Sequence, residues 1–254
     1  MTPAEILARY DAEMRADPPD EAGVRHERAG GIVRAIGAYN CILFSNLAEA
    51  DADGVIADQA ASFRAIGAEV EWKVYGHDLP ADLGDRLAAA GFEPDGQETL
   101  MAFDLALRPP DRAVPAGVEI RRVTDAAGLE DLILVSGAAF GRDDRRRLEI
   151  FRARLDDPTL GLFVAYVDGR PVSAGRMELP PKRSFASLWG GGTLPAYRGR
   201  GLYRGLVAAR AAEALRGGYR FLTIDARDTS SRPILERLGA TPLVGITGWL
   251  LRPQ

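Results

Sequence analysis

The sequence has very little of the chemistry that disulfides and metal centres need. Among its 254 residues there is one cysteine, Cys41, and there are two histidines, His26 and His77. One cysteine cannot form an intrachain disulfide, and this set of side chains is too small for the usual zinc sites. We therefore expect no metal cofactor and no structural metal.

Long apolar runs and a large excess of either charge are also missing. No apolar segment approaches the length of a membrane span, and the first residues, Met1–Glu5, lack the basic-then-apolar order of a signal peptide. A net charge of −4 argues against general binding to nucleic acid or to a membrane surface. We therefore expect a cytoplasmic protein. With 46% hydrophobic residues, the chain can fill one large domain or two smaller ones.

Arginine and glycine are concentrated in residues 193–207, which read TLPAYRGRGLYRGLV. A strand pattern ends at Thr193, Gly199 and Gly201 follow, and a helical pattern then begins. Glycines let backbone N–H groups converge on a ligand, and a helix start adds unpaired N–H groups and the positive end of its dipole. Three arginines add positive charge: Arg198, Arg200 and Arg204. The stretch predicts a pyrophosphate-binding loop, and the alternative is an arginine- and glycine-rich turn that binds nothing.

Two other phosphate-binding motifs do not fit this loop. A Walker-type loop would end in Gly-Lys-Ser/Thr, which is absent here. The dinucleotide fingerprint requires G-x-G-x-x-G, whereas Gly199, Gly201 and Gly205 give G-x-G-x-x-x-G.

The spacing of Arg198, Gly201 and Tyr203 resembles the Arg-x-x-Gly-x-Gly/Ala signature of the GNAT superfamily of acetyl-CoA-dependent N-acyltransferases. In that family a strand opens beside the loop, and its backbone binds the pantetheine arm. The glycine-rich segment Trp189–Thr193 lies where that strand is expected. Tyr203 departs from the Gly/Ala of the signature, but the family binds through the backbone amide there, so the side chain can point outward. The resemblance implies these acetyl-CoA-binding residues: Gly191, Gly192, Thr193, Arg198, Gly199, Arg200, Gly201, Leu202, Tyr203 and Arg204.

The order of elements in the second half agrees with this resemblance. Strands are predicted at 118–123, 162–167, 172–179, 184–193, 221–225 and 244–251, and helices at 126–140, 145–155, from the loop to about 215, and at 232–238. Thr124 and Asp125 should cap the first helix. The resemblance implies an α/β (α+β) protein with the acyl-CoA N-acyltransferase fold, a mixed, mostly antiparallel sheet flanked by helices.

Prolines 109, 110 and 115 predict a linker at 105–117, which divides the chain into domains 1–110 and 116–254. The first domain has a strand pattern at 68–75, a helix over 82–92 that glycine stops, and a strand at 99–105. In this domain Arg86-Leu87 precedes Gly91-Phe92. This pattern is similar to Arg237-Leu238 before Gly239-Ala240 near the end of the chain. We infer a tandem arrangement whose first copy is degenerate and lacks a phosphate loop; the alternative is an unrelated α+β cap.

Acetyl transfer to an amine requires a base for the amine and a proton for the departing thiolate. The resemblance implies that the base is a carboxylate on the strand before the phosphate loop. Glu178 is the best placed, and Asp225, which ends the next parallel strand, is the second candidate. The alternative for Glu178 is that it is an exposed hairpin residue, and the alternative for Asp225 is that it only caps a loop.

The expected source of the thiolate proton is missing. The family's closing motif is Asn-x-x-Ala-x-x-x-Tyr-x-x-x-Gly-Phe, in which the tyrosine donates to the CoA sulfur. Counting back from Gly239 places Asp228, Ser231 and Leu235 at the Asn, Ala and Tyr positions. Leucine has no proton to donate. Either the thiolate leaves unassisted or another hydroxyl serves, with three candidates: Tyr203, Ser230 and Ser231. Asp228 and Ser231 are still expected to help bind the coenzyme.

Three residues of the first half suit an amine substrate: Trp72, Tyr75 and Asp78. The alternative is that the aromatic rings are simply core. The sequence as a whole predicts an acyltransferase that uses acetyl-CoA as cosubstrate and transfers the acetyl group directly to a small-molecule amine or a peptide amine. A homodimer is compatible with this function. The other class is a catalytically silent acyl-CoA-binding or interaction module. Neither the acceptor nor the acyl-chain preference follows from the sequence.

Overall fold

The computed structural model describes residues 1–110 and 114–253, so residues 111–113 of the predicted linker lie outside the described residues. The chain forms two compact units. The first comprises Met1–Leu100, Ala226–Arg232 and Pro242–Gln254, and the second Met101–Asp225 and Pro233–Thr241. The last strand thus lies mainly with the first unit, whereas the sequence division groups it with residues 116–254. That division stays a prediction.

The elements of the second half follow the predicted order. They are β6 (Val118–Arg122), α4 (Ala126–Phe140), α5 (Arg146–Arg152), β7 (Leu160–Val167), β8 (Arg170–Glu178), β9 (Phe185–Thr193), α6 (Leu202–Arg216), β10 (Phe221–Arg227), α7 (Arg232–Arg237) and β11 (Thr241–Leu251). In the second unit the hydrogen-bonded order is β10-β9-β8-β7-β6. Only the β9–β10 pair of these is parallel.

Local chemistry sets the ends of α4 and the turn between β7 and β8. The Asp125 side chain accepts a hydrogen bond from the Gly128 N–H at 2.8 Å, which is the predicted cap. The helix ends at Gly141, whose φ of 65° is left-handed. Asp168 and Gly169 have φ of 49° and 74°, as a tight two-residue hairpin turn requires.

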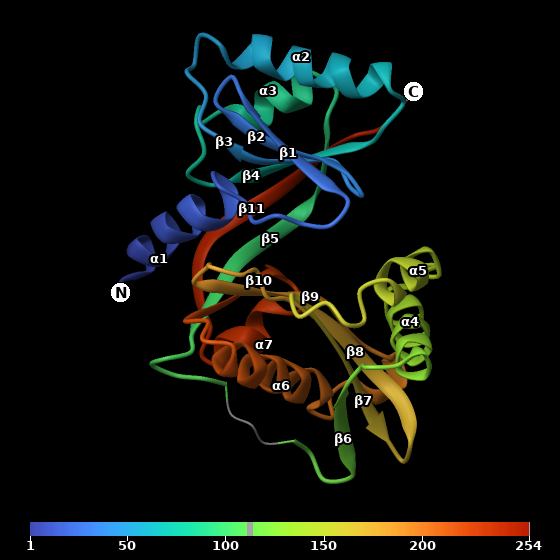
Figure 1. Cartoon of the computed structure of the whole chain (residues 1–254). Helices are drawn as coiled ribbons and strands as arrows, with labels where there is room; N and C mark the ends of the chain where they lie inside the picture. Colours follow the sequence, from blue (N-terminus) through green and yellow to red (C-terminus); the bar gives the residue numbers. More distant parts are fainter. Residues whose placement is uncertain (111–113, 254) are drawn as a thin grey trace. The chain divides into compact units, whose positions relative to one another are not determined.

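Helices cover both faces of this part of the sheet. α4 and α5 lie together on one face of β7–β9, and α6 packs on the opposite face (Figure 1). Leu129, Leu132 and Val135 of α4 are buried against Leu162 and Val164 of β7. Each such side chain contributes about 1.5–3 kcal/mol when it leaves water. This core fixes the strands that carry the site.

The first unit is built on a second set of strands with its own core. It contains α1 (Pro3–Tyr10), a π-helical turn (Asp11–Arg15), β1 (Val24–Ala29), β2 (Ile32–Gly37), β3 (Cys41–Ser45), α2 (Ala52–Ala65), β4 (Val70–Tyr75) and α3 (Leu83–Ala89). The strand order is β1-β2-β3-β4-β11, and β5 (Glu93–Asp104) contributes residues to both units. α2 and α3 lie side by side (Figure 1).

The three elements predicted in this half are present as β4, α3 and β5, and Gly91 follows α3 with φ of 91°. The sequence analysis assigned none of the elements before residue 68. None of the helices in the described ranges combines the length and the apolar composition that a membrane span needs.

Candidate functional site

The loop between β9 and α6 has the backbone that the glycine pattern predicts. Gly199 and Gly201 adopt φ of 75° and 80°, a left-handed conformation that side chains rarely tolerate, and Gly201 is the N-cap of α6. A short 3₁₀ turn, Pro195–Tyr197, leads into them. A Cβ added at Gly201 would lie 3.1 Å from Pro115 Cγ, so this position is crowded as well as strained.

The amides of this loop are available to a ligand. The first helical bond that α6 receives from the loop is Gly205 N–H to the Gly201 carbonyl at 3.0 Å. Within residues 1–110 and 114–253, the N–H groups of residues 199–204 donate to no protein acceptor. Unpaired N–H groups at a helix start form an anion-binding site, so the loop fits a pyrophosphate.

The arginines of the loop have different surroundings. Arg198 donates to the carbonyls of Thr193 and Ala139, at 3.1 and 3.4 Å, and so joins the end of β9 to the end of α4. The Arg200 guanidinium lies 5.0 Å from the centre of the Tyr197 ring. The Arg204 side chain is exposed.

β9 and β10 separate beside this loop. Their parallel pairing covers only Phe185–Ser187 with Phe221–Thr223, although both strands continue. The Phe185 and Phe221 rings stack at 4.9 Å where the strands still pair. Beyond Ser187, the edge of β9 that faced β10 is therefore open to receive an extended ligand.

Glycines on β9 allow side chains from both layers to reach the strand. Gly190 has φ of 57° and marks a bulge opposite the register shift in β8. A Cβ at Gly191 would lie 2.9 Å from Tyr203 Cε2, and one at Gly192 would lie 2.8 Å from Ala139 Cβ. Because neighbouring residues of a strand face opposite sides, Gly191 faces α6 and Gly192 faces α4.

The Tyr203 side chain points inward, although the sequence analysis allowed it to point outward. Its ring packs against the backbone of Gly191, because glycine leaves room there and the α6 face that carries it turns toward the sheet. Burial raises the pKa of the Tyr203 hydroxyl, and the positive charge of Arg210 opposes that rise. Apart from the glycine run, no sequence pattern predicts this packing.

Arg210 is a fully buried cation below the same stretch of β9. It donates to the carbonyls of Arg176 and Leu206 at 2.9 and 3.1 Å, and its Nη2 has no partner among the described residues. Burial lowers the pKa of this guanidinium to about 10. It therefore stays charged at neutral pH.

The two candidate bases lie on neighbouring parts of the opened sheet. Glu178 of β8 is in register with Ser187 of β9, and Ser187 is in register with Thr223 of β10. Asp225 follows Thr223 by two residues, so by strand alternation it faces the same side as Thr223. The Glu178 carboxylate accepts from Arg176 Nη1 at 2.9 Å and from Arg154 Nη2 at 3.5 Å. Register thus brings both candidates to one face of the sheet.

The residues of the closing motif have partners of their own. Asp228 accepts from Thr99 Oγ1 at 2.6 Å and from Arg232 Nη1 at 3.2 Å, and the Thr99 bond lowers the pKa of this carboxyl. Ser231 is half-buried. Leu235 is completely buried, so a tyrosine there would overpack the core.

The three candidate substrate residues of the first half pack inside the first unit. Trp72 is fully buried and donates from its indole N–H to Ser45 Oγ at 2.7 Å. Asp78 accepts two hydrogen bonds from Arg15, at 2.9 and 2.6 Å, and the Arg15 guanidinium lies 3.6 Å from the centre of the Tyr75 ring. These contacts favour the alternative that the sequence analysis left open, a structural role. Arg15, which organises them, had no recognisable signal in the sequence.

Comparisons with known proteins agree with this geometry. Residues 129–240 match the model of the Acetyltransferase (GNAT) family. A GCN5-related N-acetyltransferase from Kribbella flavida has a similar structure, with a TM-score of 0.72 and 20% identity over 91% of this chain and 90% of that one. A GCN5-related N-acetyltransferase from Sphaerobacter thermophilus has a TM-score of 0.66 and 16% identity, over 98% of this chain and 85% of that one. A comparison with curated proteins gave no matching relative.

A tandem GNAT protein from the clavulanic acid biosynthesis pathway is also similar, with a TM-score of 0.64 and 16% identity over 97% of this chain and 93% of that one. Residues 129–240 are thus similar to the GNAT acetyltransferase family, and the fold is that of GNAT proteins, tandem ones included.

Proposed function

We propose that the protein is an acetyl-CoA-dependent N-acetyltransferase that transfers the acetyl group directly to a small-molecule amine or a peptide amine. The observation that carries the proposal is the loop at residues 199–204, whose unpaired amides adjoin the opened edge of β9. Such an arrangement offers an anion site and a strand-like binding edge next to each other. The fold similarity and the family match support the same reaction class.

Acetyl-CoA would supply the activated acetyl thioester. The amides of Gly199–Arg204 would bind its pyrophosphate, and Gly191, Gly192 and Thr193 would bind the extended arm through their backbone. Of the arginines, Arg200 and Arg204 add positive potential near the phosphates, whereas Arg198 holds the loop against α4. Asp228 and Ser231 remain coenzyme-binding candidates on sequence grounds.

A base is needed because an amine attacks only in its neutral form. Glu178 is our first candidate, because it shares a register row with Ser187 and Thr223 where the sheet opens. Asp225, on the same face of β10, is the second. Arg154 and Arg176 position the Glu178 carboxylate by binding both of its oxygens.

For the thiolate proton, Tyr203 is the best of the three candidate donors. Its ring lies against Gly191 on the strand that borders the opening, whereas Ser230 is exposed on the turn after β10. The charge of Arg210 stabilises the phenolate that proton donation leaves behind, because it acts in a buried, low-dielectric setting. Water then restores the proton.

The test is release of CoA from acetyl-CoA in the presence of a broad amine panel, monitored with a thiol reagent. We expect amine-dependent release that follows saturation kinetics. Tight binding of acetyl-CoA with no release for any amine would instead support the alternative, a silent acyl-CoA-binding module. A cytoplasmic location, a homodimer and the domain division at residues 110 to 116 remain part of this proposal, on sequence grounds.

A further inference from the structure

Arg176, which binds the candidate base, has an incomplete set of hydrogen-bond partners among the described residues. Arg176 of β8 places its guanidinium 5.6 Å from the centre of the Trp189 ring and 5.9 Å from that of Phe151 on α5. Its Nη1 binds Glu178. Its Nε is buried and has no partner among the described residues, although a guanidinium N–H in such a setting is costly to leave unpaired.

A second guanidinium faces the same region from α5. Arg147 and Phe151 are four residues apart on this helix and so share one face, and the Phe151 ring is the one that Arg176 approaches. The nearest acid to Arg147 is Asp144, at 3.8 Å, which is too long for a hydrogen bond. Asp144 is already bound by Ser136 and Arg142.

The surroundings leave Arg147 short of negative charge. Burial lowers the pKa of Arg147, and the like charges of Arg142 and Arg176 add to the effect, against Asp144 alone. Asp144, the one acid that opposes these charges, also binds Ser136 and Arg142.

We propose that the acceptor is a small amine that also carries an anionic group, which binds between Arg147 and Arg176. Planar guanidinium forks match carboxylate and phosphonate oxygens, and the Nε of Arg176 supplies a donor that no group among the described residues accepts from. The same Arg176 guanidinium carries this Nε donor and binds Glu178 through Nη1. The acceptor's anionic group and its reacting amine should therefore be separated by only a few bonds. α-Amino acids and short aminoalkylphosphonates have this chemistry.

The inference rests on the proposed function and is tested by matched acceptors. Each α-amino acid is compared with its carboxamide, which removes the anion but keeps the side chain, and aminomethylphosphonate is compared with methylamine. We expect the best acceptor's kcat/KM to exceed that of its uncharged partner by about ten-fold or more, since a charge-assisted hydrogen bond is lost. Comparison of kcat/KM between the amino acids and aminomethylphosphonate shows whether a carboxylate or a phosphonate is preferred.

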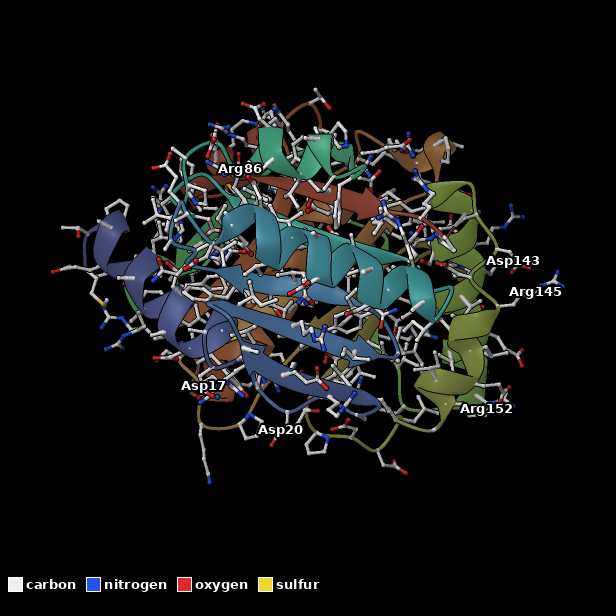
Figure 2. The ribbon with its side chains drawn as sticks, turned by 90° about the horizontal axis from the view of Figure 1, so that it is seen from above. Asp17, Asp20, Arg86, Asp143, Arg145 and Arg152 are labelled. Carbon is white, nitrogen blue, oxygen red and sulfur yellow. The ribbon has the colours of Figure 1, made fainter. Side chains whose placement is uncertain are left out.

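Arg147→Gln should remove this preference through the acceptor KM, with the KM for acetyl-CoA unchanged, and Arg147→Lys should keep part of it. The matched control is Arg145→Gln at the start of the same helix. The Arg145 side chain is 87% exposed and points outward, like that of Arg152 (Figure 2). Melting temperatures of the variants check that each is folded.

Two results would overturn the inference: uncharged amines acetylated as well as their anionic partners, or an Arg147→Gln variant that keeps the wild-type preference. If no amine is acetylated, the proposed function fails while the inference is still decided by saturation-transfer NMR. In that measurement the anionic amines should bind to the wild type and to Arg145→Gln but not to Arg147→Gln, and binding that is equal in all three would contradict it.

Discussion

The ring of Tyr203 on α6 packs directly against the backbone of Gly191 on β9, where an added Cβ would come within 2.9 Å of Cε2. This contact joins the helix that carries the phosphate loop to the strand edge that borders the opening. It makes a glycine at 191 a packing requirement as well as an aid to ligand approach.

Gly191→Ala should therefore lower the free energy of unfolding by about 1–3 kcal/mol, as overpacking does, unless the Tyr203 ring shifts. Urea denaturation measures the change. In a Tyr203→Ala background the same substitution should cost much less, because the crowded ring is gone. An equal cost in both backgrounds would show that the contact is not the cause.

Tyr203→Phe tests the proton donor. We expect kcat to fall by up to about 10²-fold with the affinity for acetyl-CoA unchanged, because only the hydroxyl is lost. Since burial raises the pKa of Tyr203, loss of its proton should not reduce the wild-type rate in the pH range where an ordinary tyrosine ionises. A variant with wild-type kcat at every pH would remove Tyr203 from the account.

Glu178→Gln tests the base. An amide cannot accept the ammonium proton, so turnover should fall and the low-pH limb of the rate profile should disappear, while acetyl-CoA affinity is kept. Asp225→Asn, on β10 two strands away, is the matched comparison. If Glu178→Gln keeps the wild-type profile and Asp225→Asn loses it, the base is Asp225.

Asp144 should make stability depend on pH in the acid range. Burial of this carboxyl would raise its pKa, but hydrogen bonds from Ser136 and Arg142 outweigh it and hold the pKa below the ordinary 3.8. The contribution of Asp144 to the free energy of unfolding is therefore fully present above pH 3.8. It is lost as the pH falls through the lower pKa of the folded state. Asp144→Asn should be less stable than wild type at neutral pH, with the gap closing in acid; a gap that stays constant would contradict this.

Local signals in the sequence were sufficient for much of the second unit. Asp125 is a good N-cap because its short carboxylate accepts the Gly128 N–H, and that chemistry can be read from neighbouring residues alone. The glycines at 199 and 201 likewise predict the left-handed backbone that the structure has there. The glycine loop was therefore predicted correctly between β9 and α6, while its binding of phosphate stays a proposal.

Features that depend on distant partners were not accessible. Tyr203 points inward because Gly191, on another element, leaves space for its ring. The buried Asp78 carboxylate is bound by Arg15, which is distant in the sequence. β1–β3 escaped prediction because their strands are short and partly exposed, so the alternation of apolar and polar residues is weak. The basic surroundings of Glu178 also arise only after β8, β9 and α5 come together.

The central claim, that the loop at residues 199–204 binds acetyl-CoA, is tested most directly by calorimetric titration of the wild type and Gly201→Glu with acetyl-CoA. The substituted carboxylate would occupy a left-handed position and repel the pyrophosphate, so we predict saturable binding to the wild type and none to the variant. Circular dichroism confirms that the variant is folded. Near-native affinity in a folded Gly201→Glu protein would contradict the claim.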